Sequence, residues 1–162
     1  MSLSGALEAA GARGWDTVIA GPGPGILGAG TVYGHGGMMA LDVLNAAIAL
    51  DMPAVLSPRL SKGDPRPRHQ GLSHHTEAVL ALALGEIEVP LPDGLEDLAF
   101  HIAGLDGGQR KVTLRPADTD AYGASGLSRR SMGRDLEEDP IFFAAPLAAG
   151  RRLAALVLHP GD

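Results

Sequence analysis

The chain has 162 residues, a formal charge of −6 and no cysteine, so disulfides and thiolate chemistry are excluded. Hydrophobic residues make up 45% of it and charged residues 20%, which excludes a wholly disordered chain and fits a single domain over 1–162. The acidic balance argues against nucleic acid and acidic membranes as partners, and no apolar run is expected to reach the roughly 18 residues that span a bilayer, so we expect a cytoplasmic domain.

The first third of the chain alternates helical and strand-like patterns around a glycine-rich segment. An amphipathic pattern predicts a helix over 3–12, and the short apolar run at 17–20 predicts a strand buried on both faces. Eight of the 23 glycines then fall within 21–37, which we call the glycine segment. After it, the spacing of apolar residues predicts a helix over 38–50 and a second buried strand over 54–56.

A polar, proline-broken loop at 57–72 precedes the rest of the predicted elements. Ser73 is the expected N-cap of a helix from 74 to 84, because its hydroxyl can accept a bond from a free backbone N–H. Further strands are predicted over 87–91 and 111–114, and helices over 94–105, 118–130 and 139–158. Pro146 is expected to kink or divide the last helix.

Strands that alternate with helices favour parallel pairing through right-handed crossovers. We therefore predict an α/β fold: a three-layer Rossmann-like open sheet, mostly parallel, with about four strands and helices on both faces. So few strands leave both edges of the sheet exposed. This indicates either a homodimer or a missing part of a longer polypeptide.

Three stretches carry a resemblance to a known family. They are GPGPGILGAGTVYGHGG at 21–37, DPRPRHQGLSHH at 64–75 and SMGRDLEEDPIFF at 131–143. In this order they resemble a bacterial family of unknown function, whose longer members carry a β-rich N-terminal region ahead of an α/β C-terminal half. The resemblance covers about residues 5–155 and implies that the chain is similar to that C-terminal half alone. It implies no activity and no cofactor.

The glycine segment is the first candidate for ligand binding. Gly23 to Gly28 match the dinucleotide pattern, but the predicted helix starts only near Gly37, and no lysine precedes Thr31 as a phosphate loop requires. We interpret the segment as a ligand-contacting loop at the carboxyl end of the first strand, where backbone N–H groups can approach an anion. Its candidate residues are Gly23, Gly25, Gly28, Gly30, Thr31 and Tyr33. The alternative is that the glycines only permit tight packing.

The second candidate is the stretch 57–75, which carries a formal charge of +3 in an acidic chain. Arginine forks suit phosphate or carboxylate groups, prolines stiffen the loop, and the start of a helix attracts anions. The candidate ligand-binding residues are Arg59, Arg66, Arg68, Ser73 and His75, joined by Arg134 from a later segment. The alternative is that Arg66 and Arg68 pair with the acids at 135–139 within the fold.

Histidines are the candidate acid–base groups, because histidine titrates near neutrality. If the domain is an enzyme, we expect His35, His69 or His74 to be catalytic. A competing interpretation is a metal-dependent hydrolase that uses these histidines and His75 with Asp42, Asp64 or Glu77 as ligands. We assign no metal ligand, because side chains at 74 and 75 should diverge by about 100° on a helix and nearby arginines repel a cation.

The sequence thus predicts a domain that binds a small anionic molecule, a phosphorylated or carboxylated metabolite, between the glycine segment and the loop at 59–75. This interpretation requires the regions around His35 and Arg66 to meet over one rim of the sheet. The alternative is a non-catalytic structural or oligomerisation module, in which the basic loop pairs with 135–139 of a neighbour. The sequence identifies neither a cofactor nor a reaction.

Overall fold

Three separate strand pairs make up the sheet structure of residues 2–23 and 26–159, the part of the chain that the computed structural model describes. The two long strands run parallel, and the other two pairs are short and antiparallel. The pairs are β3 (Ile87–Pro92) with β4 (Arg110–Arg115), β1 (Leu60–Ser61) with β2 (Gly71–Leu72), and β5 (Arg130–Ser131) with β6 (Arg134–Asp135). The predicted Rossmann-like sheet of about four parallel strands is therefore wrong.

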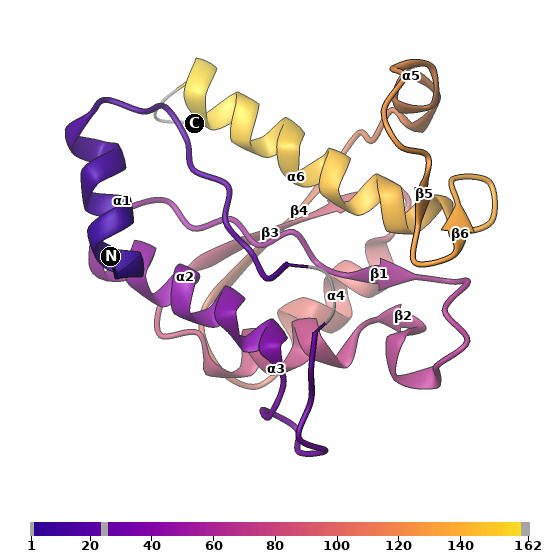
Figure 1. The fold of residues 1–162 in the computed structure, drawn as a ribbon, viewed down its shortest axis with the longest axis horizontal. Helices are drawn as coiled ribbons and strands as arrows, with labels where there is room; N and C mark the ends of the chain where they lie inside the picture. The colour runs from indigo at the N-terminus through magenta and orange to yellow at the C-terminus, as the bar shows by residue number, and fades with distance from the viewer. Residues whose placement is uncertain (1, 24–25, 160–162) are drawn as a thin grey trace.

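The strand predicted at 17–20 does not form. Val18 and Ile19 are 41% and 86% exposed, so this apolar run lies on the surface. The edge of β3 is occupied instead by residues 54–56, where the Leu56 N–H donates to the Glu88 carbonyl and the Glu88 N–H donates to the Ala54 carbonyl, both at 2.8 Å. The second predicted strand, at 54–56, is reduced to a single parallel bridge between Val55 and Glu88. Figure 1 shows the chain after the first helix crossing in front of β3.

The helices agree better with the sequence, because their signals are local. The predicted helices at 3–12, 38–50, 74–84 and 94–105 are confirmed within a few residues, while the one at 118–130 is shorter. The observed helices are α1 (Leu3–Ala12), α2 (Met39–Ala49), α3 (His74–Leu82), α4 (Glu96–Ala103), α5 (Thr119–Ala124) and α6 (Pro140–Leu158), with short 3-10 turns η1 (Gly36–Met38) and η2 (Pro67–His69). As expected, Ser73 caps α3, and its hydroxyl accepts a bond from the His75 N–H at 3.3 Å.

The core is built around β3. Ile87, Val89 and Leu91 are fully buried, and Ile102 of α4 is buried against the same cluster. Figure 1 shows α6 along one side of the β3–β4 pair and α2, α3 and α4 on the other. Apart from Glu88, β3 consists of apolar residues, as is typical of a strand covered on both faces, and this is why a strand could be predicted here.

Helix α6 continues through Pro146 without being divided. Contrary to expectation, this helix of 19 residues, in which an 18-residue window has a mean hydropathy of 1.6, is long and apolar enough to cross a membrane by length and composition alone. In this structure one face of α6 packs on β3, and the Arg152 Nε lies 2.7 Å from a Glu88 carboxylate oxygen. That buried ion pair ties α6 to the core.

Candidate functional site

A cavity of about 440 Å³ lies between the glycine segment and α3, and we call it the histidine cavity. Its wall combines glycines with the imidazole groups of histidines and the guanidinium groups of arginines. Its lining residues are Ile26, Gly28, Gly30, Thr31, Val32, Gly34, His35, Arg66, Arg68, His69, His74 and His75. Among these described residues there is no aspartate or glutamate.

The glycine segment reaches this cavity as a tight turn rather than as a loop at the end of a strand. Gly28 forms an antiparallel bridge with His35, the Ala29 N–H donates to the Gly34 carbonyl at 2.6 Å, and the Gly36 N–H donates to the Leu27 carbonyl at 2.9 Å. The tip of the turn is exposed, and its base places the His35 side chain, 9% exposed, against α3. The turn therefore delivers one imidazole to the first turn of a helix.

Four imidazoles meet at this point. The rings of His35 and His75 stack at 4.0 Å between centroids, and the rings of His74 and His75 are 4.3 Å apart. The His69 ring lies 4.9 Å from each of the two helical histidines. The expectation that residues 74 and 75 diverge is wrong, because both lie at the very start of α3, where the rings turn toward neighbours on other segments.

Several nitrogen atoms of this cluster are buried without a hydrogen bond. Within the part of the chain that the structure describes, Nδ1 and Nε2 of His35, Nε2 of His74 and Nδ1 of His75 have no partner. His69 differs, since its Nδ1 lies 2.7 Å from the Ser73 hydroxyl. A buried polar atom left unpaired costs about 1–3 kcal/mol, so four such nitrogens in one cluster are energetically unfavourable.

Burial also sets the charge of the imidazoles. It lowers the pKa of His69 to about 4, with the positive charge of Arg59 adding to the effect. It lowers the pKa of His75 to about 3, and that of His74 is lowered for the same reason, with Arg68 as the next cause. These three imidazoles are neutral at pH 7, each with one lone pair and one N–H.

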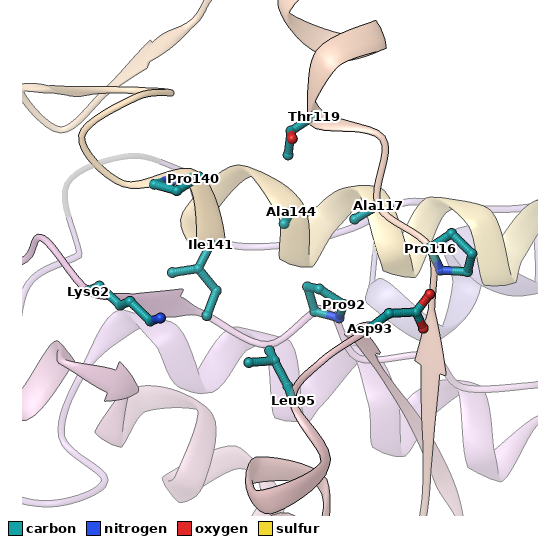
Figure 2. A pocket seen from close by; sticks show the side chains of 10 residues that line it. All are labelled: Lys62, Pro92, Asp93, Leu95, Pro116, Ala117, Thr119, Pro140, Ile141 and Ala144. Carbon is teal, nitrogen blue, oxygen red and sulfur yellow. The ribbon is translucent and has the colours of Figure 1, made fainter.

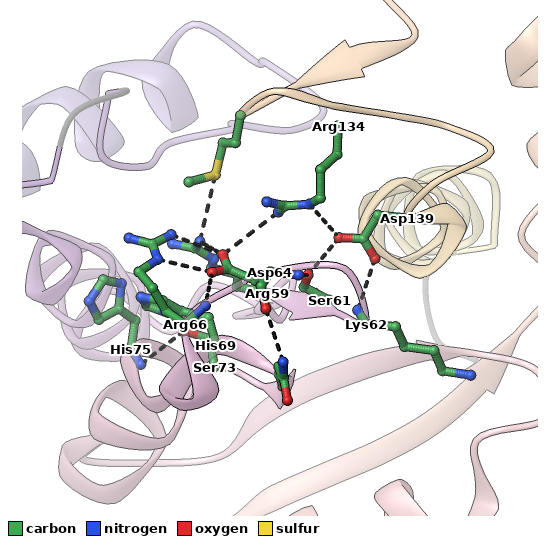
Figure 3. A network of polar contacts seen from close by, with 12 residues as sticks. Arg59, Ser61, Lys62, Asp64, Arg66, His69, Ser73, His75, Arg134 and Asp139 are labelled. Atoms are coloured by element: carbon green, nitrogen blue, oxygen red, sulfur yellow. Dashed lines mark hydrogen bonds and ion pairs between the residues drawn. The ribbon is translucent and has the colours of Figure 1, made fainter.

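Behind the cavity, the buried carboxylate of Asp64 gathers three arginines (Figure 3). Arg66 donates from Nε and Nη2 to its two oxygens at 2.9 Å each, and Arg59 Nη2 lies 3.0 Å from it. Arg134 Nη2 follows at 3.7 Å. These bonds, from Arg66 above all, hold the pKa of Asp64 well below its usual range.

A second buried carboxylate, Asp139, anchors the same region to α6. Arg134 Nε donates to it at 2.9 Å, the Ser61 hydroxyl at 2.5 Å and the Lys62 backbone N–H at 2.9 Å. Arg134 arrives through the β5–β6 turn, where Met132 and Gly133 adopt positive φ angles of 53° and 82°. Sequence reasoning missed these roles of Ser61 and of the two aspartates. The closeness of Asp64 to Arg66 in the chain was the available signal.

The predicted ligand residues divide into two groups. Those on the wall of the histidine cavity are Gly28, Gly30, Thr31, His35, Arg66, Arg68, His69, His74 and His75. Gly23, Tyr33, Arg59, Ser73 and Arg134 are not among the lining residues, and Gly25 lies outside the described residues. The regions around His35 and Arg66 do face one cavity, but not over the rim of a sheet, because the expected first strand is absent from the described residues. Their ligand-binding roles stay predictions.

The carboxyl ends of β3 and β4 border a different cavity of about 510 Å³ (Figure 2). Lys62 and Asp93 are its charged residues, and prolines and aliphatic side chains form most of the rest. This is the place where open parallel sheets commonly bind ligands. Here it has far fewer polar groups than the histidine cavity.

Comparison with known proteins adds one match. A family model described as a protein of unknown function, DUF3866, matches residues 1–150. No curated protein and no solved structure matches the chain. The chemistry of the site therefore rests on the residues just described.

Proposed function

The chain belongs to the DUF3866 family of proteins of unknown function, as the resemblance indicated, and we propose that its histidine cavity binds a small molecule carrying a phosphate or carboxylate group. The observation that carries this proposal is the positive character of the cavity wall. Arg66 and Arg68 line it and no described lining residue is acidic, in a chain of net charge −6. Asp64 offsets the charge of Arg66 from behind the wall, so Arg68 is the main cation that a ligand would meet. A charged cleft of this kind concentrates ligands of the opposite sign.

The two arginines have different roles. Arg66 is fixed by its two bonds to Asp64, so it holds the loop in place. Its side chain is half-exposed and also lines the cavity. Arg68 also lines the cavity, and among the described residues it forms no ion pair. Its guanidinium is thus available to an anion, on a loop whose prolines reduce the entropy lost on binding.

The imidazoles complete the ligand environment. A neutral imidazole, such as that of His74, can donate one hydrogen bond and accept another. The rings of His35 and His74, which carry unpaired nitrogens, line the cavity. Gly28 and Gly30 of the glycine segment also line the cavity. A phosphate or carboxylate in this space would meet the imidazoles and the guanidinium of Arg68.

The test is thermal unfolding of the protein as purified, with and without inorganic phosphate or citrate. We expect a rise in Tm with at least one of the two anions, since a ligand that binds the folded state stabilises it. Arg68→Gln should remove that rise, because it deletes the available guanidinium and leaves the Arg66–Asp64 pair intact. Arg151→Gln, exposed on α6, is the matched control and should keep it. No rise with either anion would overturn the proposal.

The alternative of a structural module has less support. It requires the acids at 135–139 to pair with the basic loop of a neighbour. Asp139 is already bonded to Arg134 and Ser61 of its own chain, and Glu137 pairs with Arg129.

A further inference from the structure

We infer that His35, His74 and His75 bind a divalent transition-metal ion of the zinc class, with one coordination position open to the histidine cavity. This inference deepens the proposed function and rests on it for the nature of the group at the open position, an anion. It names a cofactor for the same site, and the metal can be tested separately from the anion.

The three histidines offer one nitrogen atom each, and these three atoms lie within 4.8 Å of one another. In a tetrahedral site with metal–nitrogen bonds of about 2.0–2.1 Å, the ligand atoms are about 3.3 Å apart. A modest inward rotation of the rings closes that difference. The ligands come from two rigid places, the start of η1 and the first turn of α3, so little backbone has to move.

The unpaired nitrogens point to a metal rather than to simple packing. A histidine that only fills the core normally satisfies its ring nitrogens with hydrogen bonds. Here each of the three rings has at least one buried nitrogen without a partner among the described residues. One ion would accept a lone pair from each ring, which leaves one nitrogen of His35 to be paired separately.

The glycine at position 37 allows the His35 and His75 side chains to lie close together. A Cβ at this position would lie 2.8 Å from His35 Nδ1 and 3.6 Å from the His75 Cβ. Any larger residue would push the His35 ring away from its place beside α3. Glycine therefore keeps one proposed ligand next to another.

The ligand set selects the class of metal. Imidazole nitrogen suits zinc, copper, nickel and iron. Magnesium and calcium prefer oxygen ligands such as carboxylates, and the described cavity wall has no carboxylate. His69 is not one of the three histidines whose ligand atoms lie within 4.8 Å of one another, and its Nδ1 lies 2.7 Å from the hydroxyl of Ser73, the cap of α3. We assign His69 a positioning role behind the two helical ligands.

The nearby arginines do not prevent this binding. The charge of Arg66 is partly offset by its bidentate pair with Asp64. Arg68 remains as the cation that faces the cavity, and an anion bound at the open position would lie between it and the metal. Positive charge on both sides of one anion is the arrangement that phosphate sites use.

The experiment titrates the chelator-treated full chain with ZnCl₂ in a phosphate-free buffer, by calorimetry and by thermal unfolding. We expect one ion per chain and a higher Tm. With CoCl₂ we expect the intense visible bands of four-coordinate Co²⁺. His35→Gln and His74→Gln should each weaken zinc binding at least about tenfold. His101→Gln, exposed on α4, should leave it unchanged.

The histidine variants could lose zinc binding because they fail to fold, so a second variant, Gly37→Ala, retains every histidine. We expect Gly37→Ala to bind zinc more weakly and to have an unchanged circular dichroism spectrum. The metal inference is overturned by the absence of stoichiometric zinc binding, or by binding that survives both His35→Gln and His74→Gln. Phosphate is then added to the zinc-loaded and metal-free forms. If zinc binds but phosphate raises neither Tm, the anion proposal fails and the metal site stands. If phosphate raises the Tm of a chain that binds no zinc, the metal site fails and the anion proposal stands.

Discussion

Asp64 is the residue on which the basic loop depends. Its carboxylate is inaccessible to solvent and faces Arg59, Arg66 and Arg134, so its charge offsets three guanidinium groups. Asp64→Asn keeps the shape but leaves those cations without a counter-ion. Because breaking a buried ion pair leaves charge uncompensated, we expect a loss of about 3 kcal/mol in the free energy of unfolding, measured with urea. The exposed control Asp16→Asn should change stability by less than about 0.5 kcal/mol; equal losses would contradict the prediction.

The buried imidazoles give the metal-free protein a defined response to acid. Folding lowers the pKa of His69 to about 4 and that of His75 to about 3, whereas the unfolded chain titrates near 6.5. Below about pH 6.5 the unfolded state therefore binds more protons, and stability falls as the pH drops toward the folded values. We expect a loss of about 2 kcal/mol for each of the two rings, or about 3–4 kcal/mol in all, between pH 7 and pH 5.

Urea midpoints of the metal-free protein at the two pH values provide the measurement. His101→Gln, which removes an exposed histidine, should retain the loss, and His69→Gln should reduce it. Identical pH dependence in wild type and His69→Gln would show that burial of this ring does not set its proton affinity.

Only part of the site was predictable from single residues. The candidates on the cavity wall came from residue type and position alone, since arginine, histidine and glycine each bring a distinct capacity. The convergence of His74 and His75 was not predictable, because a helical wheel treats both as mid-helix positions. Their rings instead follow the geometry of the cap at Ser73 and the neighbours that the turn at His35 supplies. The partner of Arg66 was two residues away and was overlooked.

Among the elements, those with local signals were predictable. Helices α2 and α3 follow from apolar spacing and a capping serine, and β3 from its continuous burial. The run at 17–20 has the same composition as a buried strand, yet strand formation needs an edge to pair with, and residues 54–56 take that edge. Local composition carries no information about which of two candidate segments occupies the edge.

The cap of α3 is an element-scale device that serves both the helix and the site. The Ser73 hydroxyl is buried, bonded to the His75 N–H and 2.7 Å from His69 Nδ1. Ser73→Ala should cost about 1–2 kcal/mol, at the upper end for an N-cap. Ser2→Ala removes the exposed cap of α1 and is the matched control, for which thermal unfolding should show a smaller loss. A larger loss for Ser2→Ala would contradict this assignment.

On the scale of the whole molecule, stability is expected to be uneven. The core around β3 is buried on both faces, whereas the described residues 16–23 form no backbone hydrogen bonds and expose Ile19. Local opening therefore needs little free energy at residues 16–23. At β3 it needs nearly the full free energy of global unfolding. Hydrogen exchange should be complete within seconds at 16–23 and slowest at Ile87, Val89 and Leu91. Slow exchange at 16–23 would mean that this segment is covered in solution.

The contact of His35 with α3 closes a loop of about 40 residues that contains all of α2. Elsewhere a disulfide would secure such a closure, and a link across that span restricts the unfolded chain by about 4 kcal/mol. This chain has no cysteine with which to form one. An ion shared by the two ends would act as a removable staple, so the availability of metal could set how firmly α2 is held to the rest of the protein.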